Sequence, residues 1–119
     1  TMRGGRAVLV EVKSSISARM PIFARAGVPM VKPQQATQLD EWHELGALCL
    51  VVVKVGEGWW AIPWREWNKA EQDLLIRRAD GGTRQASFSQ DDLDFMGHRL
   101  PMLSPYRLAP DWLAPWRSE

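Results

Sequence analysis

The stretch Ala7-Val-Leu-Val-Glu-Val-Lys13 is an apolar run that ends with a carboxylate and an ammonium group two residues apart. Its β-branched residues are typical of a buried β-strand. Side chains at positions i and i+2 share one face of a strand, so we expect Leu9, Glu11 and Lys13 on one side and the three valines on the other. Charged side chains are rare on a core strand unless they pair or bind an ion. The Glu-x-Lys pattern therefore requires an explanation.

Two explanations fit this pair of charges. In the first, the strand reaches solvent and Glu11 and Lys13 form an ion pair at the rim, which contributes little to stability. In the second, the pair belongs to a metal-dependent phosphodiesterase site. Glu11 would then hold a hard divalent cation through oxygen, and Lys13 would steady the attacking water or the charge that builds on the phosphate. Glu-x-Lys is too short a pattern to decide between them.

The composition indicates one globular domain, because 119 residues are enough to bury a hydrophobic core. Cys49 is the only cysteine, so no disulfide can form within the chain. It lies in an apolar run, which indicates a small buried residue. No apolar run reaches the ~18 residues of a membrane span, and no signal peptide is visible. We therefore expect a cytoplasmic protein with no membrane partner.

The charges are unevenly distributed although the net charge is only +1. Residues 1–35 carry a net charge of +5, and the remainder carries −4. The basic residues of the first segment are Arg3, Arg6, Lys13, Arg19, Arg25 and Lys32. A local positive field of this kind is typical of proteins that bind a phosphate backbone, although a solvated basic loop would have the same composition.

A long connection, residues 14–33, separates the first strand from a helix predicted over 34–45. Pro33 suits the first turn of that helix and Gly46 its end. We expect its buried stripe to be Leu39, Trp42 and Leu45. Gln35 lies one turn before Leu39 on the same face, where an amide is unexpected. It either caps free backbone N–H groups or points toward Glu11 and Lys13.

The remaining elements are read from apolar runs and turn residues. Residues 47–55 and 59–62 read as two paired strands around a turn at 56–58. The order strand, helix, strand, strand implies an α/β core with a right-handed crossover. In the second half we predict a helix over 64–73, a hairpin of 74–78 with 83–88, and a helix capped by Ser89 that ends at Met96. The seven Trp residues are either core or interface residues, or a contact surface for a partner.

The order of these motifs resembles the PD-(D/E)xK nucleases, and within them the RecU-type Holliday junction resolvases of bacteria and phages. Glu-x-Lys on a strand is followed by a basic loop, by Gln35-x-x-x-Leu39 opening a helix, by an apolar strand, and by Trp60-Ala-Ile-Pro63. The resemblance covers roughly residues 3–67. It implies a restriction-endonuclease-like α/β fold, with a mixed central sheet flanked by helices, in a single nuclease domain over 1–119. Residues 68–119 would form a Trp- and Pro-rich C-terminal extension.

The resemblance also implies a function. The chain would be a Mg²⁺-dependent endodeoxyribonuclease, with Mn²⁺ as an alternative metal, that acts in DNA recombination and repair. As a homodimer it would make paired symmetric nicks across a four-way DNA junction. Glu11, Lys13 and Gln35 would be catalytic, and the Glu11 carboxylate and the Val12 carbonyl would bind the metal. The residues that fall where the family contacts DNA are Arg6, Arg19, Arg25 and Lys32.

One departure from the family pattern concerns the metal. The family has a metal-binding Asp on the strand before Glu-x-Lys, but residues 1–10 contain no acidic residue. We therefore expect an N-terminal segment of the native protein to precede Thr1. One carboxylate alone is a poor Mg²⁺ site, so the alternatives are a DNA-binding module of the same fold that has lost catalysis, or a more general nuclease of this superfamily.

Overall fold

The computed structural model describes residues 2–3, 6–24, 27–104, 107–108 and 112–116. The order of elements among them is β1 (Met2–Arg3), β2 (Arg6–Ser15), β3 (Met20–Pro21), α1 (Pro33–Glu44), β4 (Leu48–Val55), β5 (Gly58–Pro63), α2 (Trp64–Ala79), β6 (Ser87–Phe88), α3 (Gln90–Met96), β7 (His98–Arg99), β8 (Met102–Ser104), β9 (Arg107–Leu108) and the 3₁₀ helix η2 (Ala114–Trp116). The expected α/β class is confirmed.

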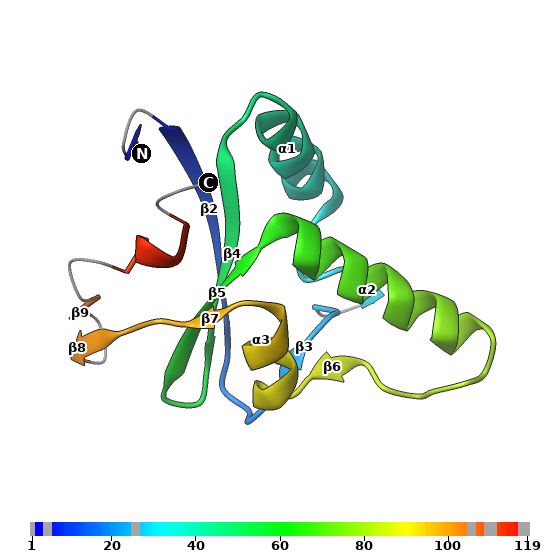
Figure 1. Cartoon of the computed structure of the whole chain (residues 1–119). Coiled ribbons are helices and arrows are strands. Elements are labelled where there is room, and N and C mark those ends of the chain that lie inside the picture. Colours follow the sequence, from blue (N-terminus) through cyan, green and yellow to red (C-terminus); the bar gives the residue numbers. More distant parts are fainter. Residues whose placement is uncertain (1, 4–5, 25–26, 105–106, 109–111, 117–119) are drawn as a thin grey trace.

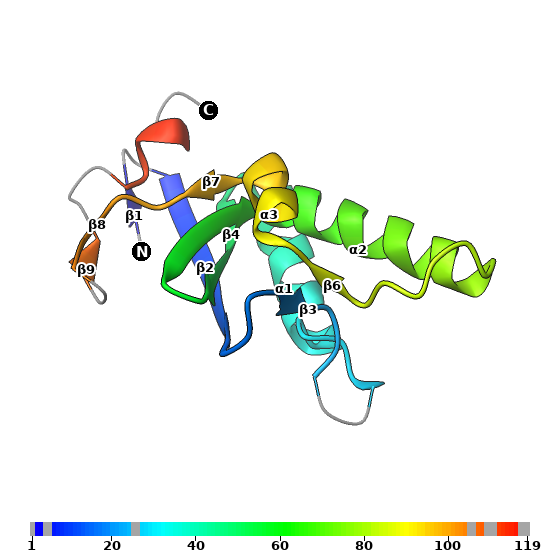
Figure 2. The same ribbon diagram turned by 90° about the horizontal axis from the view of Figure 1, so that it is seen from below.

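A mixed sheet with the strand order β1-β2-β4-β5-β7 forms the centre of the described structure. β2 and β4 are parallel, and the other neighbouring strands are antiparallel. Figures 1 and 2 show α1, α2 and α3 on one face of this sheet, while the segment that contains β8, β9 and η2 lies on the other. Each face has its own hydrophobic core as a result.

Strand β4 is apolar along nearly its whole length because both of its faces are buried. Its odd-numbered residues belong to the core under the helices, and Leu48, Leu50 and Val52 belong to the core under the C-terminal segment. Strands covered on both faces read as continuous apolar runs rather than as alternating ones. The central strand predicted from residues 47–55 is thus confirmed, as are the following turn and β5.

Strand β2 alternates between the two cores as its sequence predicted. Leu9 packs on the helix side, whereas Val8 and Val10 pack on the opposite side. Val12, further along the strand, is 56% exposed. The two cores therefore cover the first half of β2 better than its second half, which is where its charged residues lie.

The outer edge of β2 is only partly covered. β1 pairs with the beginning of the strand, Met2 with Ala7 and Arg3 with Arg6. Within the described residues, no strand lies beside the rest of this edge, residues 8–15. An open edge of this length presents backbone N–H and C=O groups on which a further strand can form.

Helix α1 spans Pro33–Glu44, one residue earlier at each end than the predicted 34–45, and Pro33 lies in its first turn as expected. Gly46, the predicted stop, follows the C-cap Leu45 with a φ of 89°, a left-handed conformation that suits glycine. The predicted buried stripe is wrong beyond Leu39. Leu39 is 2% exposed, but Trp42 and Leu45 are 44% and 81% exposed. A step of three residues falls about 60° short of a full helical turn, so each such step moves further from the buried face.

Helix α2 is longer than we predicted, and the hairpin expected after it is wrong. Residues 74–78 belong to the helix, and of 83–88 only β6 forms a strand. β6 pairs with β3 instead. The buried residues of α2 recur at helical spacing, and they are Trp64, Trp67, Glu71 and Leu74. This periodicity outweighs the Asp-Gly-Gly turn signal, which here ends a helix.

The connection between β2 and α1 is fastened to the second half of the chain. β3 pairs antiparallel with β6, and Phe23 forms a β-bridge with Pro29. Met20, Ile22 and Val31 are buried in the core under the helices. A segment that its Gly and Pro residues mark as a loop is therefore in part a packed element.

The prediction for helix α3 agrees with the structure. Ser89 caps α3 as predicted, because its hydroxyl accepts a hydrogen bond from the Asp92 N–H at 3.1 Å while the Asp92 carboxylate accepts one from the Ser89 N–H at 2.9 Å. Four of the seven Trp residues are buried, namely Trp60, Trp64, Trp67 and Trp116. Among the described residues, no helix has both the length and the apolar composition to cross a membrane.

Candidate functional site

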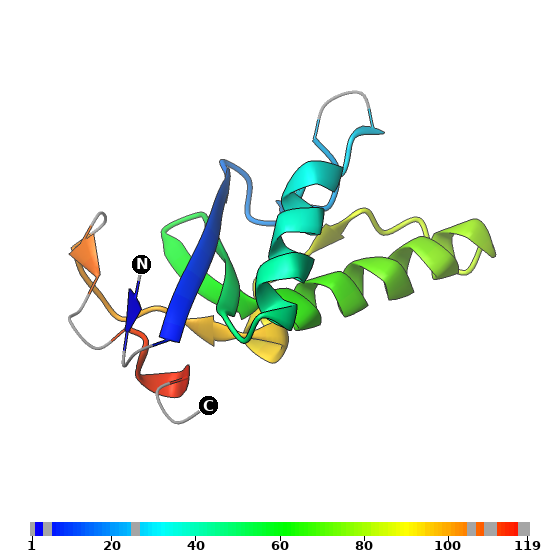
Figure 3. The ribbon, with the colours of Figure 1, turned by 90° about the horizontal axis from the view of Figure 1, so that it is seen from above.

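The side chains of Glu11, Lys13 and Gln35 meet on the helix side of β2. The Gln35 Nε2 group donates a hydrogen bond to Glu11 Oε1 at 2.8 Å, and Lys13 Nζ donates to Gln35 Oε1 at 3.1 Å. Lys13 Nζ also lies 3.3 Å from Glu11 Oε1. Figure 3 shows the end of β2 and the start of α1 at the same end of the molecule. The structure thus brings together the three residues that the sequence singled out.

Gln35 is held in one orientation by groups on two elements. Besides the bond from Lys13, its amide oxygen accepts a hydrogen bond from the backbone N–H of Lys32 at 3.0 Å. This N–H immediately precedes the first turn of α1, where backbone donors have no helical partner. Gln35 therefore does both things that the sequence left open: it satisfies a free N–H at the helix start, and it contacts the two charged residues.

The ion pair is partly removed from solvent. The side chains of Lys13 and Glu11 are 15% and 27% exposed, respectively. Solvent screens such a pair less than one on an open surface. The arrangement places a cation able to bind a phosphate beside a carboxylate able to bind a metal ion, and both remain reachable from solvent.

The residues predicted to contact DNA differ in how the structure places them. Lys32 is exposed at the start of α1, next to the cluster. Arg19 is exposed in the connection after β2, where its Nε donates to Ser87 Oγ at 2.7 Å and its Nη2 to the Ser87 carbonyl at 3.2 Å. Arg25 and the side chain of Arg6 lie outside the described residues. Lys32 is thus the described basic residue of this group that borders the cluster.

The donors found at the cluster do not fit a complete Mg²⁺ or Mn²⁺ site. Mg²⁺ takes an octahedral shell of oxygens and is usually held by one or two carboxylates. Glu11 Oε1 already accepts a hydrogen bond from Gln35 and pairs with Lys13. The one other metal ligand that the family resemblance implies is the backbone carbonyl of Val12. In the described part of the chain, no group of three or more His, Cys, Asp or Glu residues is placed to hold a metal ion. Such a site would need a further acidic ligand.

Sequence reasoning did not select the serines that shape the turn after β2. The hydroxyls of Ser15 and Ser17 both donate to the carbonyl of Arg19, at 2.8 Å and 2.7 Å. Ser17 Oγ also accepts the Arg19 N–H at 3.2 Å. The signal was the Ser-x-Ser repeat, since serine hydroxyls readily bond nearby backbone groups in turns.

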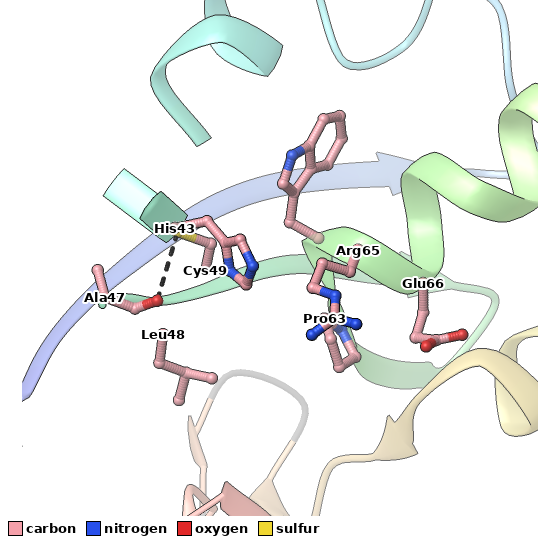
Figure 4. A pocket seen from close by; sticks show the side chains of 8 residues that line it. His43, Ala47, Leu48, Cys49, Pro63, Arg65 and Glu66 are labelled. Atoms are coloured by element: carbon pink, nitrogen blue, oxygen red, sulfur yellow. Dashed lines mark hydrogen bonds between the residues drawn. The ribbon is translucent and has the colours of Figure 1, made fainter. Parts of the chain in front are cut away.

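A separate pocket of about 380 Å³ lies at the opposite end of β4 (Figure 4). Its lining includes the side chains of His43, Arg65 and Glu66, together with the buried Cys49. The Cys49 thiol lies 3.4 Å from the carbonyl of Leu39, which matches its expected role as a small buried residue. None of the predicted site residues lines this pocket.

Comparison of the sequence with protein-family models and with curated proteins found no match in either case. The resemblance to the junction resolvases therefore remains a hypothesis, and the geometry of the Glu11–Lys13–Gln35 cluster is the structural observation that bears on it.

Proposed function

We propose that this chain carries the core of a metal-dependent DNA endonuclease that resolves four-way junctions. The observation that supports this proposal is the contact of Glu11, Lys13 and Gln35 on the exposed half of β2, with Lys32 beside them. Gln35 is hydrogen-bonded to both charged side chains and to the Lys32 N–H, so the cluster is held in one arrangement. The single cysteine, Cys49, is buried and forms no disulfide, which is compatible with the cytoplasm as the compartment in which the enzyme works.

The three residues would have distinct roles. Glu11 would be a metal ligand, and the bound Mg²⁺ or Mn²⁺ would supply Lewis-acid activation of the scissile phosphate and of a water molecule. Lys13 would stabilise the charge that develops on the phosphate. Gln35 would act as a positioning residue, because its amide holds both the Glu11 carboxylate and the Lys13 ammonium group in place.

The open edge of β2 is where a further acidic ligand would fit. β1 is antiparallel to β2, with Met2 opposite Ala7. Within the described residues, no strand lies beside residues 8–15 of this edge, so a further strand could pair there with the part of β2 that carries Glu11. Directly opposite residues share one face of a sheet. An acidic residue opposite Glu11 on such a strand would supply a second carboxylate for Mg²⁺.

The proposed substrate is branched DNA, and the proposed assembly is a homodimer. A four-way junction with equivalent arms has two-fold symmetry, so a C₂ dimer presents one site to each of two strands. The basic character of the first 35 residues supports a phosphate-backbone partner.

The test is a nicking assay with the purified protein. A labelled four-way junction and a matching duplex are each incubated with Mg²⁺ or with EDTA. Paired symmetric nicks on the junction alone, lost in EDTA and in Glu11→Ala, would support the proposal. Equal cutting of the duplex would replace it with a general nuclease. Undiminished cutting by the Glu11→Ala variant would overturn the role of the cluster.

A second candidate is a DNA-binding module of this fold without catalysis. The observation that favours it is that Glu11 is already paired with Lys13 and hydrogen-bonded by Gln35, while the described residues form no metal-binding group. It predicts that the junction is bound but never cut. Both candidates predict that affinity falls steeply with salt, because phosphate contacts release counterions.

A further inference from the structure

The side chain of Ile16, in the turn that follows β2, is fully exposed to solvent. Ile16 has an exposed fraction of 108%, the highest among the large apolar side chains of the described residues, ahead of Phe95 at 94% and Leu45 at 81%. The turn projects from the body of the molecule in Figures 1, 2 and 3. Single apolar side chains on a surface are common, so the surroundings of Ile16 decide whether its exposure has a use.

The backbone on both sides of Ile16 is held by hydrogen bonds. Ser15 and Ser17 flank it, their hydroxyl oxygens lie 3.0 Å apart, and each donates to the carbonyl of Arg19. The Arg19 side chain in turn binds Ser87 through two hydrogen bonds. The turn is thereby tied to β6, on a distant part of the chain. An aliphatic side chain held outward on a braced turn loses little conformational freedom when a partner covers it.

The turn lies close to the candidate site and within its basic surroundings. Ile16 follows Lys13 by three residues and lies just past the end of β2, so the two are at most about 10 Å apart along the chain. This separation corresponds to about three base-pair steps of DNA. Arg19 and Lys32 are the exposed basic residues at the two ends of the connection that begins here. An apolar tip beside a carboxylate–lysine cluster and near basic side chains matches a surface that meets DNA.

We propose that Ile16 is a wedge that inserts between neighbouring bases of the bound DNA, next to the strand held at Glu11 and Lys13. This inference rests on the proposed function, since it takes DNA as the partner. Proteins that kink DNA commonly insert Phe, Leu, Ile or Met side chains between base steps and partly unstack them. Unstacking is least costly where pairing is already disturbed, which favours a branch point over a continuous duplex.

The inference is tested by a fluorescence titration. The 119-residue chain is added to a four-way junction that carries 2-aminopurine beside the branch point, because this base brightens when it is unstacked. The wild type is expected to raise the fluorescence. Ile16→Ser is expected to abolish the rise and to weaken binding about tenfold, while Ile16→Met retains both. Leu45→Ser, an equivalent change at the far end of α1, serves as the matched control and is expected to behave as the wild type.

The salt dependence of binding separates this role from charge contacts. Because Ile16 is uncharged, Ile16→Ser is expected to leave the slope of log affinity against log salt unchanged, whereas Lys32→Ala reduces its magnitude by about one. If the wild type binds the junction without any rise in fluorescence, or if Ile16→Ser retains the rise, the wedge is wrong while the proposed function stands. If the wild type binds no DNA, both are overturned.

Discussion

Strands β2 and β4 lie side by side and in parallel, yet their second halves have opposite chemistry. Glu11 on β2 is opposite Val51 on β4, and Lys13 is opposite Val53. Both valines are completely buried, whereas the two charged side chains remain partly exposed and contact Gln35. β4 thus contributes buried apolar residues to the core, whereas β2 carries the charged residues of the candidate site.

The largest effect is expected from placing a charge on the buried strand β4. Val51→Asp would bury a carboxylate with no partner, at a cost on the order of 5 kcal/mol, which is comparable to the whole stability of a small domain. We expect this variant to lack a cooperative thermal transition in circular dichroism. Glu11→Val, the converse change on β2, is expected to melt within a few degrees of the wild type. A folded Val51→Asp protein would contradict the distinction between the two strands.

Removing the carboxylate of β2 is expected to affect function and not folding. Glu11→Ala should lower the rate of junction nicking by about 10³-fold or more, because it removes the proposed metal ligand. Its free energy of unfolding should change by only about 1 kcal/mol, since a partly solvated ion pair contributes little. Glu44→Ala, at the exposed end of α1, is the matched control for both measurements.

A smaller loss is expected for the residue that positions the pair. Gln35→Ala removes three hydrogen bonds and should slow nicking by about 10- to 100-fold, an effect typical of residues that orient a site. The cost in stability should be about 1 kcal/mol. The neighbouring Gln34 is exposed, so Gln34→Ala is the comparison variant. Equal rates for the two variants would show that the amide of Gln35 has no positioning role.

The smallest effect concerns a carboxylate in the other part of the molecule. Burial raises the pKa of Glu71 above its usual value of 4.5, although a hydrogen bond from Trp67 partly opposes this rise. A raised pKa in the folded state means that Glu71 favours folding at low pH, and that this contribution is lost as the pH increases through the folded pKa. Glu71→Gln keeps an acceptor for Trp67 and should be more stable than the wild type at neutral pH.

The measurement for Glu71 is a series of denaturant unfolding curves from pH 4 upward. The stability advantage of Glu71→Gln is expected to grow with pH and then to level off. An advantage that is constant over this range would mean that the ionisation of Glu71 is not coupled to folding. The charges of β2 provide the contrast, since they have partners and Glu71 has only the Trp67 indole as a described hydrogen-bond partner.

The first half of the chain could be predicted from its sequence because its signals are local and consistent. The apolar run of β4, Pro33 and Gly46 at the ends of α1, and the alternation of β2 each follow from one physical rule. The approach of Gln35 to Glu11 could also be anticipated, since an amide on the inward face of the helix needs a polar partner. The sequence could not indicate the exposed open edge of β2.

The second half was less predictable because two signals competed there. The Asp80-Gly-Gly turn indicated a hairpin, while the periodic buried residues of α2 required a long helix. The pairing of β6 with β3 joins segments that are more than 60 residues apart, and no short pattern records such a contact. The bonds of Arg19 to Ser87 arise from the same long-range pairing.

The most direct measurement uses a variant in which β2 carries the apolar residues of β4 at the two charged positions. In the double variant Glu11→Val/Lys13→Val, both charges are replaced by the residue found opposite them on β4. We expect its melting temperature to equal or exceed that of the wild type, because apolar replacement of an ion pair is often neutral or stabilising. Junction nicking is expected to disappear. A variant that unfolds, or one that still nicks the junction, would contradict the claim that these charges serve function and not the fold.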